Sequence, residues 1–144
     1  MKEDAMQSIS QGRQANINGK ALEINVSQLL TQLGCSFKEQ VKFTNVYGSA
    51  RAKVDFMIDD LAIECKFQNV AGSVSEKMPY AYENLNLFNR GLLVLDGEYF
   101  KKHEGLQAYL NSKVSEKFDW CFVDDLAEWL MENFIVKTNS GTST

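Results

Sequence analysis

The chain has 144 residues, a hydrophobic fraction of 44% and a formal net charge of −4. This length suits one domain with a core of its own, in a globular protein. No run of about 18 apolar residues and no apolar segment near the start is present, so neither a membrane span nor a secretory signal is expected. We therefore expect a cytoplasmic protein. The single histidine, His103, excludes a two-histidine mechanism, and three dispersed cysteines disfavour a structural zinc site.

The chain begins with a polar segment that lacks periodicity. We expect an N-terminal arm over residues 1–15, one domain over 16–136 and a flexible tail over 137–144. A helix is predicted over 18–33, because leucine and valine recur there at helical spacing. Glu23 falls at the margin of that apolar stripe, where a carboxylate can reach a neighbouring cleft or remain an ordinary exposed residue. A strand is expected within 37–47.

Two apolar-rich runs, 51–58 and 61–68, flank the polar pair Asp59–Asp60 and predict a β-hairpin. A two-residue turn at that pair would place Asp55 directly opposite Glu64, with Cβ atoms about 4.5–5.5 Å apart. Two carboxylates at that distance repel each other, and a divalent cation converts the repulsion into binding. Mg²⁺ is commonly held by one or two carboxylates together with waters and phosphate oxygens.

Alternation along the second run separates an apolar face from a face that becomes steadily more polar. Glu64, Lys66 and Gln68 lie on the polar face. Val54 and Phe56 are expected to continue the apolar face on the partner strand. The alternative remains open at this point, because alternating charges on a strand also occur on an ordinary solvated face.

The second half of the chain alternates between helical and strand patterns. We predict a helix that opens with a capping box at Ser73 and Glu76 or begins at Pro79, and that ends at Gly91. We also predict a helix within 99–113 and a last helix capped by Asp124–Asp125. Short apolar runs at 92–95 and 120–123 predict buried strands. This alternation implies crossovers and a partly parallel sheet. The expected fold is an α/β/α sandwich with a central mixed β-sheet.

Residues 18 to 90 resemble the PD-(D/E)xK nuclease superfamily, the restriction-endonuclease-like phosphodiesterases. The segment Gly19-Lys-Ala-Leu-Glu23, the hairpin acids and lysine, and Gln68 two residues beyond that lysine carry the resemblance. Val54 stands where the name-giving proline of the family would be. The resemblance implies a restriction-endonuclease-like fold and a nuclease activity.

The resemblance also implies roles for the residues of the motif. Asp55 and Glu64 would bind Mg²⁺, with Mn²⁺ as a substitute, and the backbone carbonyl of Cys65 would add a ligand. Glu23 would hold the metal through a water molecule. Lys66 would orient or activate the attacking water and stabilise charge on the phosphate.

Further residues are expected to act on the water or on DNA. Gln68 would help position the water or a phosphate. Candidate DNA contacts are polar or basic residues around the hairpin and the next loop: Arg51, Lys53, Ser73 and Lys77. Tyr80 is expected only to pack.

The resemblance thus implies a metal-dependent DNA endonuclease that hydrolyses phosphodiester bonds. Because one active site cuts one strand, site-specific double-strand cleavage of the restriction or homing type requires a homodimer or homotetramer. The negative charge is awkward for a monomeric DNA binder and also favours an oligomer. The alternatives are a structure-specific nuclease like a Holliday-junction resolvase and a non-catalytic DNA-binding relative.

Overall fold

Five strands form one sheet in the computed structural model, which describes residues 11–135 except the side chains of 11–17, 73–74 and 134–135. The strands lie in the order β1-β2-β3-β4-β5. The first three pair antiparallel, and β3, β4 and β5 pair parallel, so the sheet is mixed as predicted. Their bounds are β1 (Lys38–Phe43), β2 (Ala52–Ile58), β3 (Leu61–Phe67), β4 (Arg90–Asp96) and β5 (Phe118–Phe122).

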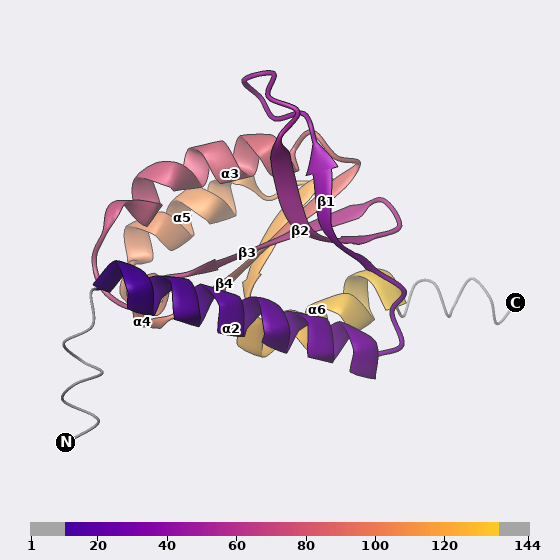
Figure 1. Cartoon of the computed structure of the whole chain (residues 1–144), viewed down its shortest axis with the longest axis horizontal. Coiled ribbons are helices and arrows are strands. Elements are labelled where there is room, and N and C mark those ends of the chain that lie inside the picture. The colour runs from indigo at the N-terminus through magenta and orange to yellow at the C-terminus, as the bar shows by residue number, and fades with distance from the viewer. Residues whose placement is uncertain (1–10, 136–144) are drawn as a thin grey trace, which may run out of the picture.

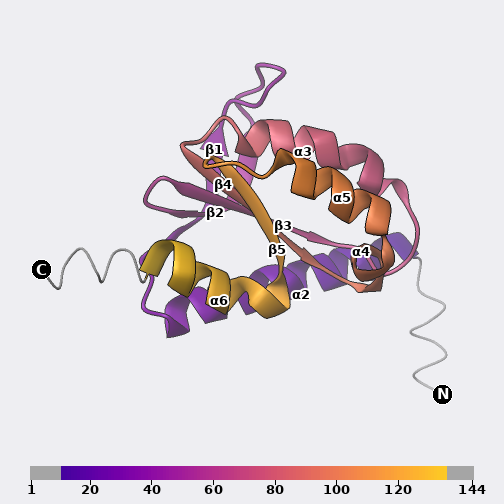
Figure 2. The same cartoon turned by 180° about the vertical axis from the view of Figure 1, so that it is seen from behind.

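Helices cover both faces of this sheet (Figures 1 and 2). One layer holds α2 (Gln11–Gln32) and α6 (Leu126–Leu130), and the other holds α3 (Met78–Leu85), α4 (Glu98–Lys102) and α5 (Glu104–Lys113). Each layer packs on its own hydrophobic cluster. β4 is buried along almost its whole length, because both layers cover it. The expected α/β/α sandwich is therefore confirmed.

The long helix α2 packs through one stripe of its surface. Leu22, Val26 and Leu30 are buried at spacing of one turn. Leu30, which helical spacing alone places at the margin of this stripe, is in fact fully buried within it. Glu23 is half-buried beside this stripe, at the edge where α2 meets the first strands.

The hairpin between β2 and β3 has the predicted register. Ile58 pairs with Leu61 and Met57 with Ala62, so Asp59 and Asp60 form the two-residue turn. Asp59 adopts a left-handed backbone conformation with φ of 51°, which aspartate tolerates better than most residues. The turn therefore fixes which residues of the two strands face each other.

The faces of β2 differ from the prediction at one point. Residues two apart on a strand normally share a face, yet Val54 packs in the cluster under α3 while Phe56 packs in the cluster under α2. The regular alternation of side chains along β2 is therefore broken at Asp55, the residue between Val54 and Phe56. Regular pairing with β3 extends from the turn only to Phe56 and Ile63.

The predicted helix before β4 was too long. Its α-helical part ends at Leu85, and Gly91 lies inside β4 instead of ending the helix. A Cβ atom at position 91 would lie 2.8 Å from both the Cβ and the carbonyl oxygen of Leu85. The glycine is thus required by the close approach of β4 to the end of α3.

The expected helix within 99–113 is divided into α4 and α5 at His103. The imidazole Nδ1 of His103 accepts a hydrogen bond from the backbone N–H of Leu106 and so caps α5. Asp125 precedes α6, but its side chain makes no cap hydrogen bond, contrary to the prediction. Within residues 11–135, no helix combines the length and apolar character needed to cross a bilayer.

The structure describes only part of the terminal segments. α2 begins at Gln11, inside the segment 1–15 that was expected to form an arm. Residues 1–10 and the tail over 137–144 lie outside the described residues. The proposed division of the chain into arm, domain and tail therefore stays a prediction.

Candidate active site

The side chains of Asp55 and Glu64 each accept a hydrogen bond from the backbone of the other strand, at the point where β2 and β3 stop pairing regularly. The Asp55 carboxylate Oδ2 accepts a hydrogen bond of 2.8 Å from the backbone N–H of Cys65. In return, the backbone N–H of Asp55 donates to Glu64 Oε1 at 3.2 Å. Side chains thus replace the missing ladder bonds between the strands, and both carboxylates are held in fixed positions at the centre of the sheet.

A third carboxylate, that of Glu23 on α2, lies close to Asp55. Gln40 on β1 donates through its amide Nε2 to Glu23 Oε1 at 2.9 Å and to Asp55 Oδ1 at 3.3 Å. One amide group therefore ties the helix acid to the strand acid. Glu23, Asp55 and Glu64 come together as expected from the sequence.

Gln40 was not predicted to belong to the site. It lies in a strand yet has a φ of 51°, a conformation that costs a non-glycine residue of order 1 kcal/mol. Such conformations persist where the surroundings determine them, and they gather at functional sites. Neither its backbone conformation nor its position between two acids could be read from the residue type.

Glu64 and Glu23 lie in an environment that opposes their ionisation. Burial, followed by the nearby Asp55 charge, raises the pKa of Glu64 to about 8, although Lys66 acts in the opposite direction. The same two causes, burial first, raise the pKa of Glu23. Burial and the neighbouring Asp55 charge therefore both disfavour the charged forms of these two glutamates.

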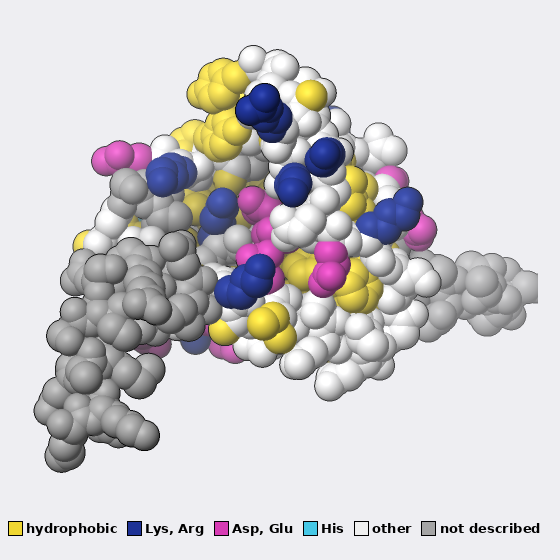
Figure 3. Space-filling model, viewed as in Figure 1, with side chains coloured by type: hydrophobic (Ala, Val, Ile, Leu, Met, Phe, Trp, Pro, Cys, Tyr) yellow, Lys and Arg dark blue, Asp and Glu magenta, His cyan; other side chains and the backbone are white. Residues whose placement is uncertain are grey.

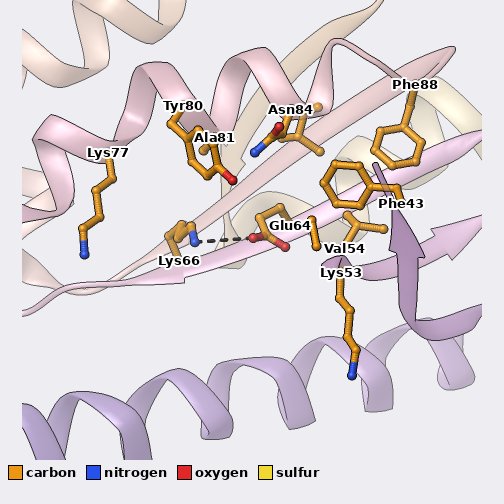
Figure 4. Close-up of a pocket in the computed structure, with 12 residues that line it drawn as sticks. Phe43, Lys53, Val54, Glu64, Lys66, Lys77, Tyr80, Ala81, Asn84 and Phe88 are labelled. Carbon is orange, nitrogen blue, oxygen red and sulfur yellow. Dashed lines mark ion pairs between the residues drawn. The ribbon is translucent and has the colours of Figure 1, made fainter. Parts of the chain in front are cut away.

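Lys66 follows Glu64 on the same face of β3. Its Nζ lies 3.4 Å from Glu64 Oε2, and about a third of the lysine side chain, 35%, is exposed. Both side chains line a cavity of about 280 Å³ between β3 and α3 (Figure 4). The ammonium group is therefore available both to the acids and to a ligand in the cavity.

Only some of the basic residues that were predicted to contact DNA line this cavity. Lys53 and Lys77 both line it, from β2 and from the turn before α3. Arg51 is exposed just before β2, outside the lining. The side chain of Ser73 lies outside the described residues, so its contact with DNA stays a prediction. Figure 3 shows acidic side chains near the centre of this face and Lys or Arg side chains around them.

Gln68 is not brought to the carboxylates. β3 ends at Phe67, and the Gln68 amide Nε2 donates to the carbonyl of Val70 at 2.7 Å. Its backbone carbonyl accepts from the N–H of Tyr99. The structure thus places Gln68 in the loop after β3, where it ties that loop to α4.

The donor set fits a hard divalent cation. Among the described residues, no three His, Cys, Asp or Glu side chains are placed to hold a metal by themselves. Asp55, Glu64 and the carbonyl of Cys65 would nevertheless give Mg²⁺ the few oxygen ligands that it takes from protein, with waters and phosphate as the rest. A cation would also offset the repulsion between Glu64 and Asp55 that contributes to the raised pKa of Glu64.

Comparison with known proteins gives one match. A family model described as PD-(D/E)XK nuclease superfamily domain matches residues 14–142, which is nearly the whole chain. No curated protein and no solved structure gives a match.

Proposed function

This chain belongs to the PD-(D/E)XK nuclease superfamily, and we propose that it is a metal-dependent DNA endonuclease. Nucleases of this superfamily generally use divalent metal ions. The observation that supports this activity most strongly is the convergence of Glu23, Asp55 and Glu64 beside Lys66. A non-catalytic relative would have no need to keep three repelling carboxylates together with a lysine.

Each residue has a distinct part in the proposed reaction. Asp55 and Glu64, with the carbonyl of Cys65, would hold Mg²⁺ or Mn²⁺, and Glu23 would hold it through a water molecule. The metal, when bound, supplies positive charge that offsets the phosphate and lowers the pKa of water. Lys66 would donate hydrogen bonds to the phosphate and orient the attacking water, since Lys66 lines the same cavity as Glu64.

The basic residues around the cavity would bind the DNA backbone. Lys53 and Lys77 lie on opposite sides of Glu64 and Lys66 along the cavity wall (Figure 4). Phosphate contacts of this kind position a strand without reading its sequence. Arg51 would extend the contact toward the loop before β2.

We further propose that a homodimer or homotetramer cuts both strands of its target. The site described here is single, so each strand requires its own copy of the chain. Site-specific cleavage of a duplex is the first candidate for the target. A structure-specific nuclease acting on branched DNA is the second, and an exposed pair of stacked tyrosines, one of which lines the cavity, favours it.

Cleavage assays test the activity directly. Purified protein is incubated with Mg²⁺ or Mn²⁺ and with supercoiled plasmid, linear duplex, single strand and a four-way junction. At least one substrate should be cut, and Asp55→Ala should cut none while still binding DNA. If the unaltered protein and Asp55→Ala bind equally well and neither cuts, the non-catalytic alternative is correct.

A further inference from the structure

The loop between β1 and β2, residues 44–51, projects above the sheet (Figure 1). It carries the exposed ring of Tyr47. Tyr47 is 82% exposed, which is unusual for so large a side chain. Its ring stacks on that of Tyr80 from α3, with centroids 5.5 Å apart and planes inclined by 12°. Tyr80 was expected only to pack, and its ring, although packed on Tyr47, is 38% exposed. One face of Tyr47 thus meets Tyr80, and most of the ring remains open to solvent.

Hydrogen bonds hold this pair in place. Asn45 donates through Nδ2 to the Tyr80 hydroxyl at 2.9 Å, and its Oδ1 accepts from the backbone N–H of Tyr47, also at 2.9 Å. The N–H of Val46 donates to the side chain of Asn84 on α3 at 3.1 Å. The loop is therefore fixed on α3, and the exposed ring is presented in a set orientation. A preorganised group of this kind loses little freedom when a ligand binds.

The pair is continuous with the candidate active site. Tyr80 lines the same cavity as Glu64 and Lys66 (Figure 4). Lys77, three residues before Tyr80, lines it too. Proteins that bind single strands combine cationic groups along the backbone with aromatic rings on which bases stack. Both elements are present here, side by side.

Bases in an intact duplex already stack on their neighbours, so an external ring can engage them only after they are unpaired. We propose that the Tyr47–Tyr80 pair is a stacking site for an unpaired nucleobase of the DNA strand that enters the cavity at Lys66. The substrate class is then DNA with unpaired nucleotides beside the bond to be cut. That this DNA is cleaved rests on the proposed nuclease function, whereas the stacking itself does not.

Binding measured without metal separates the two proposals. The fluorescent ligands are a single strand, the same strand in a full duplex, and a duplex with a single-stranded flap, all in EDTA. Tyr47→Ala should weaken binding of the single strand and the flap about tenfold, equivalent to about 1.4 kcal/mol. Duplex binding should change by less than about twofold. Tyr47→Phe keeps the ring and should bind like the unaltered protein, and Val114→Ala removes an apolar side chain that is 46% exposed on another surface as a control.

A second readout reports the stacking itself. A strand containing 2-aminopurine should lose fluorescence on binding the unaltered protein or Tyr47→Phe, and keep it with Tyr47→Ala. Circular dichroism and melting curves verify that each variant folds. If the strand is bound this way but never cut, the stacking site stands and the nuclease function fails.

Other results would overturn the stacking site. One is an equal loss of duplex and single-strand binding in Tyr47→Ala, and another is no loss at all. A third is a dimer that Tyr47→Ala dissociates while nucleic-acid binding is unchanged, because the ring would then cover a second copy of the chain. Normal duplex cleavage by Tyr47→Ala with unchanged single-strand binding would leave the nuclease proposal intact and remove the stacking site.

Discussion

Replacing Glu64 by glutamine removes one charge from the site and preserves the shape of the side chain. The amide oxygen of the glutamine can still accept from the N–H of Asp55, as Glu64 Oε1 does at 3.2 Å. Its NH₂ group can donate toward the Asp55 carboxylate, as a protonated glutamate would. The variant therefore imitates the neutral form of Glu64 and isolates the effect of ionisation.

The expected effect follows from the pKa of Glu64, which burial and then Asp55 raise from 4.5 to about 8. Between these values the folded state holds a proton that the unfolded state has lost. Stability present below about pH 4.5 is therefore lost as the pH rises through about 8. The slope is at most about 1.4 kcal/mol per pH unit. The side chain is 21% exposed, so solvent screening reduces the total, and we expect about 2–3 kcal/mol between pH 5 and pH 8.

Chemical and thermal unfolding in EDTA at a series of pH values measures this effect. Glu64→Gln should match the unaltered protein at pH 5 and exceed it at pH 8, with a melting temperature roughly 5–10 °C higher. Glu116→Gln, at an exposed glutamate, should show no such trend. Adding Mg²⁺ or Mn²⁺ should stabilise the unaltered protein at pH 8 more than the variant. A difference that is constant with pH, or a variant less stable at pH 8, would refute the reasoning.

Three further tests probe separate parts of the structure. Lys66→Ala should abolish plasmid cleavage while metal and DNA affinities stay within about tenfold, or about 1.4 kcal/mol; failure to fold would instead make Lys66 structural. Glu23→Gln should slow turnover less than Asp55→Asn in the same assay, because it is assigned to the metal only through water, and full activity of both would contradict the assignments. Gly91→Ala should lower the free energy of unfolding by about 1–3 kcal/mol, since the new Cβ meets Leu85 at 2.8 Å. Its control, Gly19→Ala in α2, meets no atom within 4 Å and should gain about 0.5–1 kcal/mol.

The hairpin register could be predicted from the sequence because local rules determine it. A two-residue turn at Asp59–Asp60 and the alternation of β3 leave one arrangement that keeps charge out of the core. The layer architecture followed from the order of elements for a similar reason. Gln68 was placed on the face of Glu64 by the same alternation, but β3 ends one residue earlier and the chain turns into a loop.

Features that join distant segments were not predictable from patterns. Gln40 reaches Glu23 only because α2, which packs on β3, comes close to β1 at this point, and because the backbone of Gln40 adopts a left-handed conformation. The stacking of Tyr47 on Tyr80 depends on how the loop after β1 docks against α3. The periodicity of apolar residues describes one helix or strand at a time. It therefore carries no information about contacts between distant segments.

The edge strand β1 bears on how copies of this chain can assemble. Its first three residues, Lys38 to Gln40, are exposed, and Gln40 interrupts the regular backbone geometry with its φ of 51°. Charged side chains and a local irregularity discourage an added strand from continuing a sheet. Two copies joined edge to edge through β1 would thus meet mismatched hydrogen-bonding groups. Any symmetric assembly that positions two catalytic centres on opposite DNA strands is expected to form through helical or loop surfaces instead.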